Sequence, residues 1–204
     1  MRLNEYFEHI YCINLDKRID RWEECQIQFE KHSLDVERFS AIDGSIIEND
    51  TKLANGELGI LRTHIELIKD AKEKGYKNIL ILEDDVEFDD DLNQNFTSII
   101  NQIPNNWIML YLGANHVGGV IQISENICQI IHSYAIHAFA INSDLFDLII
   151  NGLPKYKKPV DVFYAELQPL FPSYVIRPHL AWQRESFSDI QGGIMNYYFL
   201  RNIK

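Results

Sequence analysis

Three adjacent carboxylates, Glu83, Asp84 and Asp85, are the residues in this sequence best suited to chemistry. They directly follow the apolar run at 78–82, which is typical of a buried strand. Three carboxylates at the end of such a strand repel one another and cost stability unless a cation or hydrogen-bond donors offset the repulsion. Along an extended backbone Glu83 and Asp85 share one side, and Asp84 faces the other. Because carboxylate oxygens are hard ligands, the pair Glu83 and Asp85 predicts a site for one Mg²⁺ or Mn²⁺ ion.

Several chemistries use an acidic cluster at a strand end. The plainest interpretation is a solvated loop whose acids cap a helix, since further acids follow at 89–91. A haloacid-dehalogenase-type phosphatase needs a nucleophilic Asp where this chain has Glu83. A receiver domain needs a later phospho-accepting Asp and a later Lys at strand ends, but 92–143 holds no Asp and 78–154 no Lys. In a metal-dependent glycosyltransferase, a divalent ion neutralises a nucleoside diphosphate leaving group, and the position of the cluster suits that role.

The elements expected to position these carboxylates alternate between strand and helix in the first half of the chain. We expect strands at 11–15, 78–82 and 107–112, a turn at 41–44, and helices over 55–74 and 89–103. Another helix, capped by Asp16 or Asp20, is expected to bury Ile19, Trp22 and Phe29. Ligands bind at the carboxyl ends of strands in open α/β sheets, which is where the acidic cluster falls.

The second half has a different pattern. It predicts a hairpin from 120–123 and 127–131, one long strand over 133–142, a helix capped by Ser143 that ends near Gly152, and a last strand at 174–176. The order favours an α/β fold in which a nucleotide-binding half joins a mixed-sheet half. Without a repeat or linker, residues 1–204 are expected to form a single domain.

Composition narrows the classes of partner. The chain has 204 residues, 46 % hydrophobic and 24 % charged, with a formal net charge of -11. Such an acidic surface disfavours nucleic acid and anionic lipid as partners. No apolar run reaches ~18 residues, so no membrane span is expected. Three cysteines without metal-type spacing and a start without a signal-peptide pattern favour a cytoplasmic location.

Short sequence blocks recur in a fixed order along nearly the whole chain. The blocks are I-N-L-D-K-R at 13–18, D-R-W at 20–22, A-I-D-G at 41–44, G-E-L-G at 56–59, L-E-D-D-V at 82–86, W-I-M-L-Y-L-G at 107–113, A-F-A-I at 138–141, P-V-D at 159–161, and Gln183 with F-S-D-I at 187–190. Each block is weak alone, but together and in this order they resemble glycosyltransferase family 25, which includes bacterial lipooligosaccharide galactosyltransferases and the collagen galactosyltransferase domain. One position departs from the family, which often has Ser-His where this chain has Thr63-His64.

The resemblance implies a GT-A fold, with a Rossmann-like nucleotide-binding half beside a mixed β-sheet. It implies a metal-dependent inverting hexosyltransferase that uses a UDP-sugar, UDP-galactose or UDP-glucose, and a glycan or hydroxylated acceptor, as in lipopolysaccharide biosynthesis. The competing hypothesis is a catalytically degenerate module that keeps the nucleotide-sugar pocket without turnover.

The resemblance also implies roles for single residues. Asp85 becomes the first metal ligand, assisted by Glu83 and by His179 after the last strand, a set that favours Mn²⁺ over Mg²⁺. Inversion is a single displacement that needs a base for the acceptor hydroxyl, and Asp161 is the candidate. The alternative role of Asp161 is the N-cap of a helix over 162–167. The expected nucleotide-sugar contacts are Asn14, Leu15, Arg18, Asp43 and Asp84, with Gln183, Ser188 and Asp189 on a glycine-backed lid.

Overall fold

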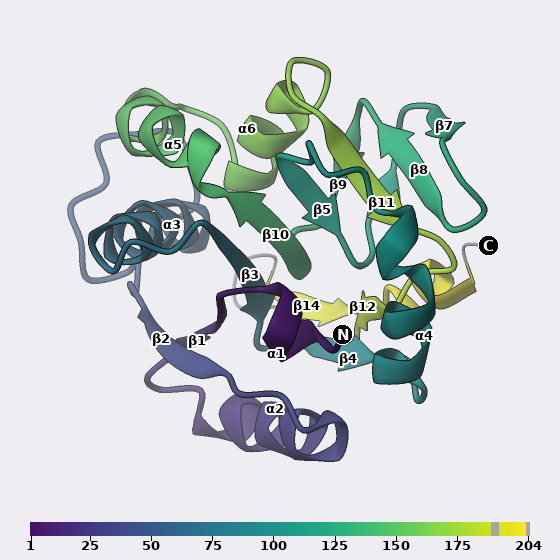
Figure 1. Cartoon of the computed structure of the whole chain (residues 1–204). Helices are drawn as coiled ribbons and strands as arrows, with labels where there is room; N and C mark the ends of the chain where they lie inside the picture. Colours follow the sequence, from purple (N-terminus) through teal and green to yellow (C-terminus); the bar gives the residue numbers. More distant parts are fainter. Residues whose placement is uncertain (189–191, 203–204) are drawn as a thin grey trace.

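The computed structural model describes residues 1–188 and 192–202 (Figure 1). Within these residues, eight strands form one mixed sheet in the order β2-β1-β3-β10-β5-β11-β8-β7. In that order the strands span Glu37–Ala41, His9–Leu15, Asn78–Glu83, Ala138–Asn142, Met109–Tyr111, Ser173–Ile176, Ile127–Ile130 and Val120–Gln122. The helices are α1 (Leu3–Tyr6), α2 (Ile19–His32), α3 (Asn55–Glu73), α4 (Leu92–Ile99), α5 (Phe146–Gly152) and α6 (Val160–Leu167).

One half of the sheet is parallel. β1 pairs in parallel with β2 on one side and with β3 on the other, and α2 and α3 form the two crossovers. Ile13 of β1 lies opposite Glu83 of β3. The carboxyl ends of β1 and β3 therefore meet at one edge, where Asn14 and the acidic cluster come together. This is the Rossmann-like arrangement expected for a nucleotide-binding half.

The other half is mixed because β10 runs antiparallel between β3 and β5. β11 pairs in parallel with β5, and β7 and β8 form the expected hairpin at the sheet edge. Short two-stranded sheets complete the described part of the chain. They pair β12 (Ala181–Gln183) with β4 (Val86–Phe88), β13 (Ser186–Ser188) with β14 (Gly193–Met195), and β6 (Asn115–His116) with β9 (Ser133–Tyr134).

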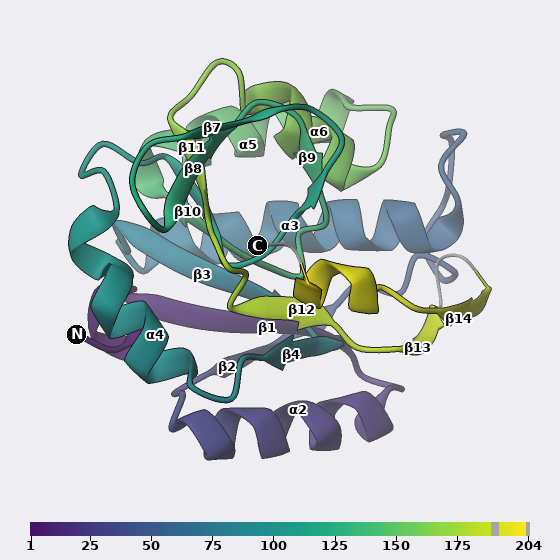
Figure 2. The same ribbon diagram turned by 90° about the vertical axis from the view of Figure 1, so that its right-hand side faces the viewer.

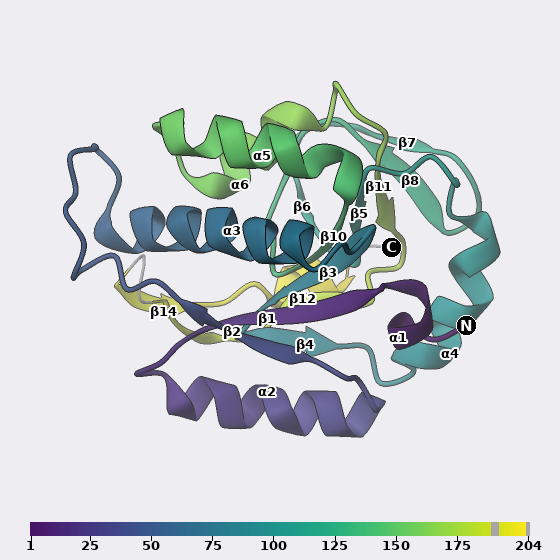
Figure 3. The same ribbon diagram turned by 60° about the vertical axis from the view of Figure 1, so that its left-hand side comes forward.

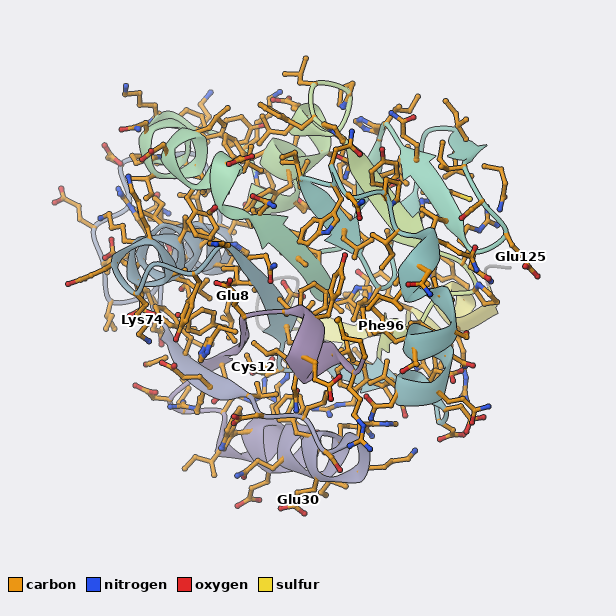
Figure 4. The ribbon with its side chains drawn as sticks, in the orientation of Figure 1. Glu8, Cys12, Glu30, Lys74, Phe96 and Glu125 are labelled. Carbon is orange, nitrogen blue, oxygen red and sulfur yellow. The ribbon has the colours of Figure 1, made fainter. Side chains whose placement is uncertain are left out.

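The sheet is covered on both faces, which is why its central strands are continuous apolar runs. Alternate residues of each strand enter different cores: Ile79 and Ile81 pack beneath α3, α5 and α6, whereas Leu80 and Leu82 face α1, α2 and α4. Figures 2 and 3 show α2 on one side of the sheet and α3 with α5 on the other. In Figure 4, Cys12 and Phe96 lie inside, while Glu30 and Glu125 project outward.

Several predicted elements are confirmed, namely the strands around 11–15, 78–82 and 107–112 and the long helix α3. Its predicted stop is also confirmed, because Gly75 after the helix has φ 78°. The predicted strand 133–142 is wrong as one element: Ala135 has φ 68°, and this left-handed residue breaks the run into β9 and β10. β11 is not the last strand either, since β12, β13 and β14 follow it.

The predicted caps and one helix face need correction. α2 has Arg18 at its N-cap rather than Asp16 or Asp20, and Ile19 is 63 % exposed. The buried face of α2 instead includes Arg21 and Cys25. The helical segment after β10 is capped by the side chain of Asn142, which accepts a hydrogen bond from Asp144 N, and not by Ser143.

Candidate active site

A cavity of about 650 Å³ opens at the edge where β1 and β3 end. Its walls come from the ends of these strands, the turn after β2, the first turns of α3 and α6, the segment at 134–136, and the region of β12 and β14. Its lining residues include Asn14, Leu15, Arg21, Asp43, Glu83, Asp84, Asp85, Asp161 and Gln183. The fold therefore brings most of the predicted site residues to one cavity.

Two close backbone contacts hold the α3 wall in place. A Cβ on Gly44, in the turn after β2, would lie 1.7 Å from Asn55 O at the start of α3. A Cβ on Gly59 would lie 2.5 Å from Ile42 O. The glycines of the A-I-D-G and G-E-L-G blocks thus let the turn and the helix touch backbone to backbone, which sets the position of the first turn of α3 in the cavity wall.

Arg21, on the buried face of α2, pairs with the acidic cluster. Its Nη2 lies 2.9 Å from Asp84 Oδ1 and 2.9 Å from Asp85 Oδ2. Asn14 Nδ2 donates to the other oxygen of Asp84 at 2.7 Å, so both oxygens of Asp84 are occupied from within the chain. Asn14 Oδ1 in turn accepts from Arg38 Nε at 2.8 Å. Asn14 and Asp84 line the cavity, but their polar atoms are already paired.

The electrostatics of the cluster favour a cation. Burial, and then the charges of Asp85 and Asp84, raise the pKa of Glu83 to about 8. Burial also raises the pKa of Asp84, against the opposing effects of Arg21 and Asn14. Among the described residues, the buried Asp85 Oδ1 has no hydrogen-bond partner. A second positive charge beside Arg21 would offset the repulsion among the three carboxylates and would give Asp85 Oδ1 a partner.

The carboxylates of Glu83 and Asp85 suit a divalent ion whose remaining ligands come from a substrate and from water. No group of three or more His, Cys, Asp or Glu side chains suited to a metal occurs within residues 1–188 and 192–202. Mg²⁺-type sites commonly use one or two carboxylates together with substrate phosphates and water, without an all-protein cage. Glu83 and Asp85 match that pattern, and their role as ligands stays a prediction.

The structure does not bring His179 to this cavity wall. His179 is 2 % exposed, its Nδ1 donates to Leu200 O at 3.0 Å, and its Nε2 lies 3.4 Å from His116 Nε2. Burial, with a smaller effect of His116, lowers the pKa of His179 to about 3. Its ring is thus a neutral, internally bonded group, and we leave it out of the donor set proposed below.

Asp161 lies in the first turn of α6 and lines the cavity. The N-cap of this helix is Pro159, so the alternative prediction of Asp161 as the N-cap is wrong by position. Asp161 Oδ1 nevertheless accepts from Val162 N at 2.7 Å. Burial raises the pKa of Asp161, the backbone hydrogen bonds oppose this, and the charge of Glu57 adds to it. A raised pKa moves a carboxylate toward the range of a general base.

The predicted nucleotide contacts divide into those at the cavity and those away from it. Asp43 lines the cavity, where Lys17 Nζ lies 2.6 Å from its Oδ2, and Lys17 with Ser45 holds the pKa of Asp43 well below its usual range. Leu15 lines the same end. Arg18 does not line the cavity and pairs with Asp20, at 2.8 Å between Nη2 and Oδ2.

The residues predicted to form a lid fall partly within the described part of the chain. Gln183 of β12 lines the cavity, and its Nε2 lies 3.5 Å from Asp85 Oδ2. The side chain of Ser188 and the whole of Asp189 lie outside the described residues. Met195 at the end of β14 and Tyr197 also line the cavity.

Sequence reasoning missed Arg21, Lys17 and Tyr134 as cavity residues. Arg21 carried a usable signal, because a cation two residues into the D-R-W block breaks the apolar stripe of an otherwise amphipathic helix. Tyr134 carried none, since its place in the wall depends on the left-handed Ala135 beside it.

The structure thus belongs to the class of open α/β proteins that carry a ligand-sized cavity at the carboxyl ends of their parallel strands, here with an acidic cluster in its wall. The model of "Glycosyltransferase family 25 (LPS biosynthesis protein)" matches residues 7–122, more than half of the sequence. The chain therefore belongs to glycosyltransferase family 25, as its sequence blocks predicted. Family membership and the observed sheet confirm the predicted GT-A-type α/β fold.

Curated relatives support the same family. A glycosyltransferase 25 family member of Drosophila melanogaster is 25 % identical over 182 residues, covering 76 % of this chain and 30 % of the relative. Procollagen galactosyltransferase 2 of Mus musculus is 22 % identical over 189 residues, covering 77 % and 30 %. The chain spans about 30 % of the length of these two relatives.

Solved structures resemble the chain more distantly. A glycosyltransferase involved in glycosylation of the major capsid of PBCV-1 has a TM-score of 0.43 at 13 % identity, covering 72 % of this chain and 64 % of that one. A197 from STIV has a TM-score of 0.46 at 10 % identity, covering 92 % and 93 %. Within the described residues, no helix is long and apolar enough to span a membrane.

Proposed function

We propose that this chain is a metal-dependent, inverting hexosyltransferase that moves a hexose, galactose first among the candidates, from a UDP-sugar to a hydroxyl of a glycan or hydroxylated acceptor. One observation carries the proposal: the cavity that holds the acidic cluster, with its unpartnered Asp85 Oδ1, also holds the half-buried carboxylate of Asp161. A single displacement needs positive charge beside the leaving diphosphate and a general base beside the acceptor hydroxyl, and this cavity would supply both.

At the donor end, Glu83 and Asp85 would hold Mn²⁺ or Mg²⁺. Such an ion, when bound, supplies positive charge that stabilises the departing diphosphate. Arg21 keeps a permanent positive charge beside Asp84 and Asp85, because the attraction of these carboxylates outweighs the effect of burial on its pKa. Leu15 and Asp43 line the part of the cavity proposed for the nucleoside. Gln183 approaches Asp85 from the β12 side and would help to close the donor end.

At the acceptor end, Asp161 would accept the proton of the attacking hydroxyl. Its hydrogen bond from Val162 N fixes one carboxylate oxygen and leaves the other as the acceptor of that proton. Burial of the group in the cavity wall raises its pKa, which makes it a stronger base than an exposed aspartate. The acceptor oxygen would then bond to the anomeric carbon as the bond to the diphosphate breaks.

The relatives' names support a galactose donor without fixing the acceptor. One relative is named a procollagen galactosyltransferase, and the family description names LPS biosynthesis. We therefore propose a glycan acceptor first and a hydroxylated peptide second. The cytoplasmic location stays a prediction, and the three buried free thiols are consistent with it.

A product assay tests this function. The protein, with Mn²⁺, is incubated with UDP-galactose or UDP-glucose and a panel of acceptor sugars, and released UDP is measured. Proton NMR of the product then gives the anomer, which is β from an α-linked donor if the reaction inverts. An α-linked product would reject the single displacement, and UDP binding without release in every combination would favour the degenerate binding module.

A further inference from the structure

Arg21 occupies a position that is costly for a charged side chain. It belongs to the first turn of α2 and is only 8 % exposed. Cys25 and Phe29 of the same helix pack with Leu80 and Leu82 of β3 in the core on this side of the sheet. A buried guanidinium is tolerated only where carboxylates pair with it, so its role is tied to Asp84 and Asp85.

The pairing treats the two carboxylates differently. Asp84 receives Arg21 on Oδ1 and Asn14 on Oδ2, so each oxygen of Asp84 already has a partner within the chain. Asp85 receives Arg21 on Oδ2 at 2.9 Å, with Gln183 Nε2 at 3.5 Å from the same oxygen. Its second oxygen, Oδ1, is buried and has no hydrogen-bond partner in the part of the chain that the structure describes. Oδ2 of Asp85 is thus held by Arg21, while Oδ1 lacks a partner among the described residues.

We propose that Arg21 is a positioning residue for the divalent ion: it holds Asp85 by Oδ2 and presents Oδ1 to the cation, and it stays in place when the cation binds. Asp84 then serves to anchor Arg21 and Asn14, and it does not contact the ion or the nucleotide. This inference rests on the metal dependence proposed above and goes beyond it by assigning which oxygen binds and what orients it.

A simpler role is conceivable, in which Arg21 substitutes for the ion and must leave before the ion can bind. The geometry argues against it. Arg21 contacts Oδ2 and not the unpartnered Oδ1, so the two cations would not compete for one oxygen. Its second anchor on Asp84 also keeps it in place if Asp85 turns slightly. The two roles predict opposite effects of removing the guanidinium on metal affinity.

Calorimetric titration with Mn²⁺ alone separates the two roles without any turnover. We expect Arg21→Gln to weaken Mn²⁺ binding about 10- to 100-fold, the usual effect of losing a partner that orients a ligand. Arg21→Lys, which keeps the charge, should bind Mn²⁺ more tightly than Arg21→Gln. Arg62→Gln, which removes an exposed arginine of α3, is the charge-matched control and should bind as the wild type does. Equal or tighter binding by folded Arg21→Gln overturns the proposal.

A crystal structure of the wild-type protein with Mn²⁺ and UDP distinguishes the two roles of Arg21 even if Arg21→Gln does not fold. We expect the ion on Asp85 Oδ1, with Arg21 Nη2 still in hydrogen-bond contact with Oδ2. An ion on Asp85 with Arg21 displaced from Oδ2 overturns the positioning role alone. If wild-type protein binds no Mn²⁺ with or without UDP, the proposed metal dependence itself fails, and the two failures are thereby distinguished.

Discussion

Asp161 shows how burial and a backbone contact set the chemistry of one side chain. Its carboxylate lies in the cavity wall with one oxygen held by Val162 N, and its pKa is raised by burial. The P-V-D block was enough to single it out from the sequence. The identity of its neighbours was not, because Glu57 reaches the same cavity from a helix about a hundred residues earlier.

Replacing Asp161 tests the base directly. We expect Asp161→Asn to lower the rate of transfer about 10²- to 10⁴-fold, the usual contribution of a general base, while UDP affinity changes little. Asparagine keeps the size of the side chain and its oxygen acceptor for Val162 N, so the fold should persist. Release of UDP from a UDP-sugar and calorimetric UDP binding are measured on the same preparation. Transfer at the wild-type rate would assign the base to another residue, with Glu57 the first candidate.

The pH profile gives a second test of the same group. A base must be ionised, so kcat/KM should fall as pH drops through the pKa of Asp161. Because that pKa is raised in the folded chain, the fall should begin at a higher pH than an ordinary aspartate would give. Stopped assays across pH 4 to 8, with circular dichroism to confirm folding, provide the measurement. A kcat/KM that stays constant as pH falls to the point of unfolding would contradict the role of Asp161 as the base.

Other residues show where sequence reasoning stops at this scale. The acidic cluster was predictable because three carboxylates after an apolar strand are conspicuous. Arg21 was missed although its charge interrupts the apolar face that Cys25 and Phe29 continue, because Ile19 was expected to be buried and proved to be exposed. The family resemblance, together with its position after a strand, predicted His179 as a ligand. That role stays a prediction, and in the structure its ring contacts Leu200 O and His116.

At the scale of elements, the cavity depends on how the turn after β2 meets the start of α3. Gly44 and Gly59 permit a contact that no Cβ would allow. Elements with strong periodicity, such as α3 and β3, were predictable because their apolar positions repeat. The break between β9 and β10 was not, because its left-handed residue is Ala135, which gives no glycine signal. The short β12, β13 and β14 were missed for lack of length.

The glycine contact can be tested with a matched pair of variants. Gly44→Ala should destabilise the protein by roughly 1–3 kcal/mol, the usual cost of overpacking, and lower Tm by about 2–4 °C for each kcal/mol. It should also weaken UDP binding, since the α3 wall of the cavity must shift. Gly119→Ala is the control, because no atom lies within 4 Å of its added Cβ. Equal Tm values for the two variants would show that the close contact between Gly44 and the start of α3 does not contribute to stability.

At the scale of the whole molecule, the two-sided sheet buries titratable groups that must stay neutral. His64 of α3 is fully buried, with its Nδ1 3.1 Å from Tyr164 Oη, and burial lowers its pKa to about 3. In the unfolded chain the same imidazole takes a proton below pH ~6.5. The stability that His64 contributes is therefore complete above pH ~6.5 and is lost as pH falls toward the folded-state value.

Comparing His64→Phe with the wild type isolates this effect, because the other titrating groups are common to both. The difference in unfolding free energy should move in favour of the variant by roughly 1.4 kcal/mol for each pH unit below 6.5. Urea unfolding at pH 7.5 and pH 5 measures it. Arg62→Gln should keep the wild-type pH dependence. Parallel curves for His64→Phe and wild type would mean that His64 is protonated or solvated in the folded chain.

We propose that the cavity binds a nucleotide together with a divalent ion on Asp85. A thermal-shift titration with UDP, GDP and CMP, each with Mn²⁺ or with EDTA, tests it most directly. Ligand at ~100 times its dissociation constant adds about 2.7 kcal/mol of stability, which is easily detected. We predict a rise specific to UDP with Mn²⁺ that is lost in Asp85→Ala. No shift with any nucleotide, or an equal shift in EDTA and in Asp85→Ala, would contradict the account.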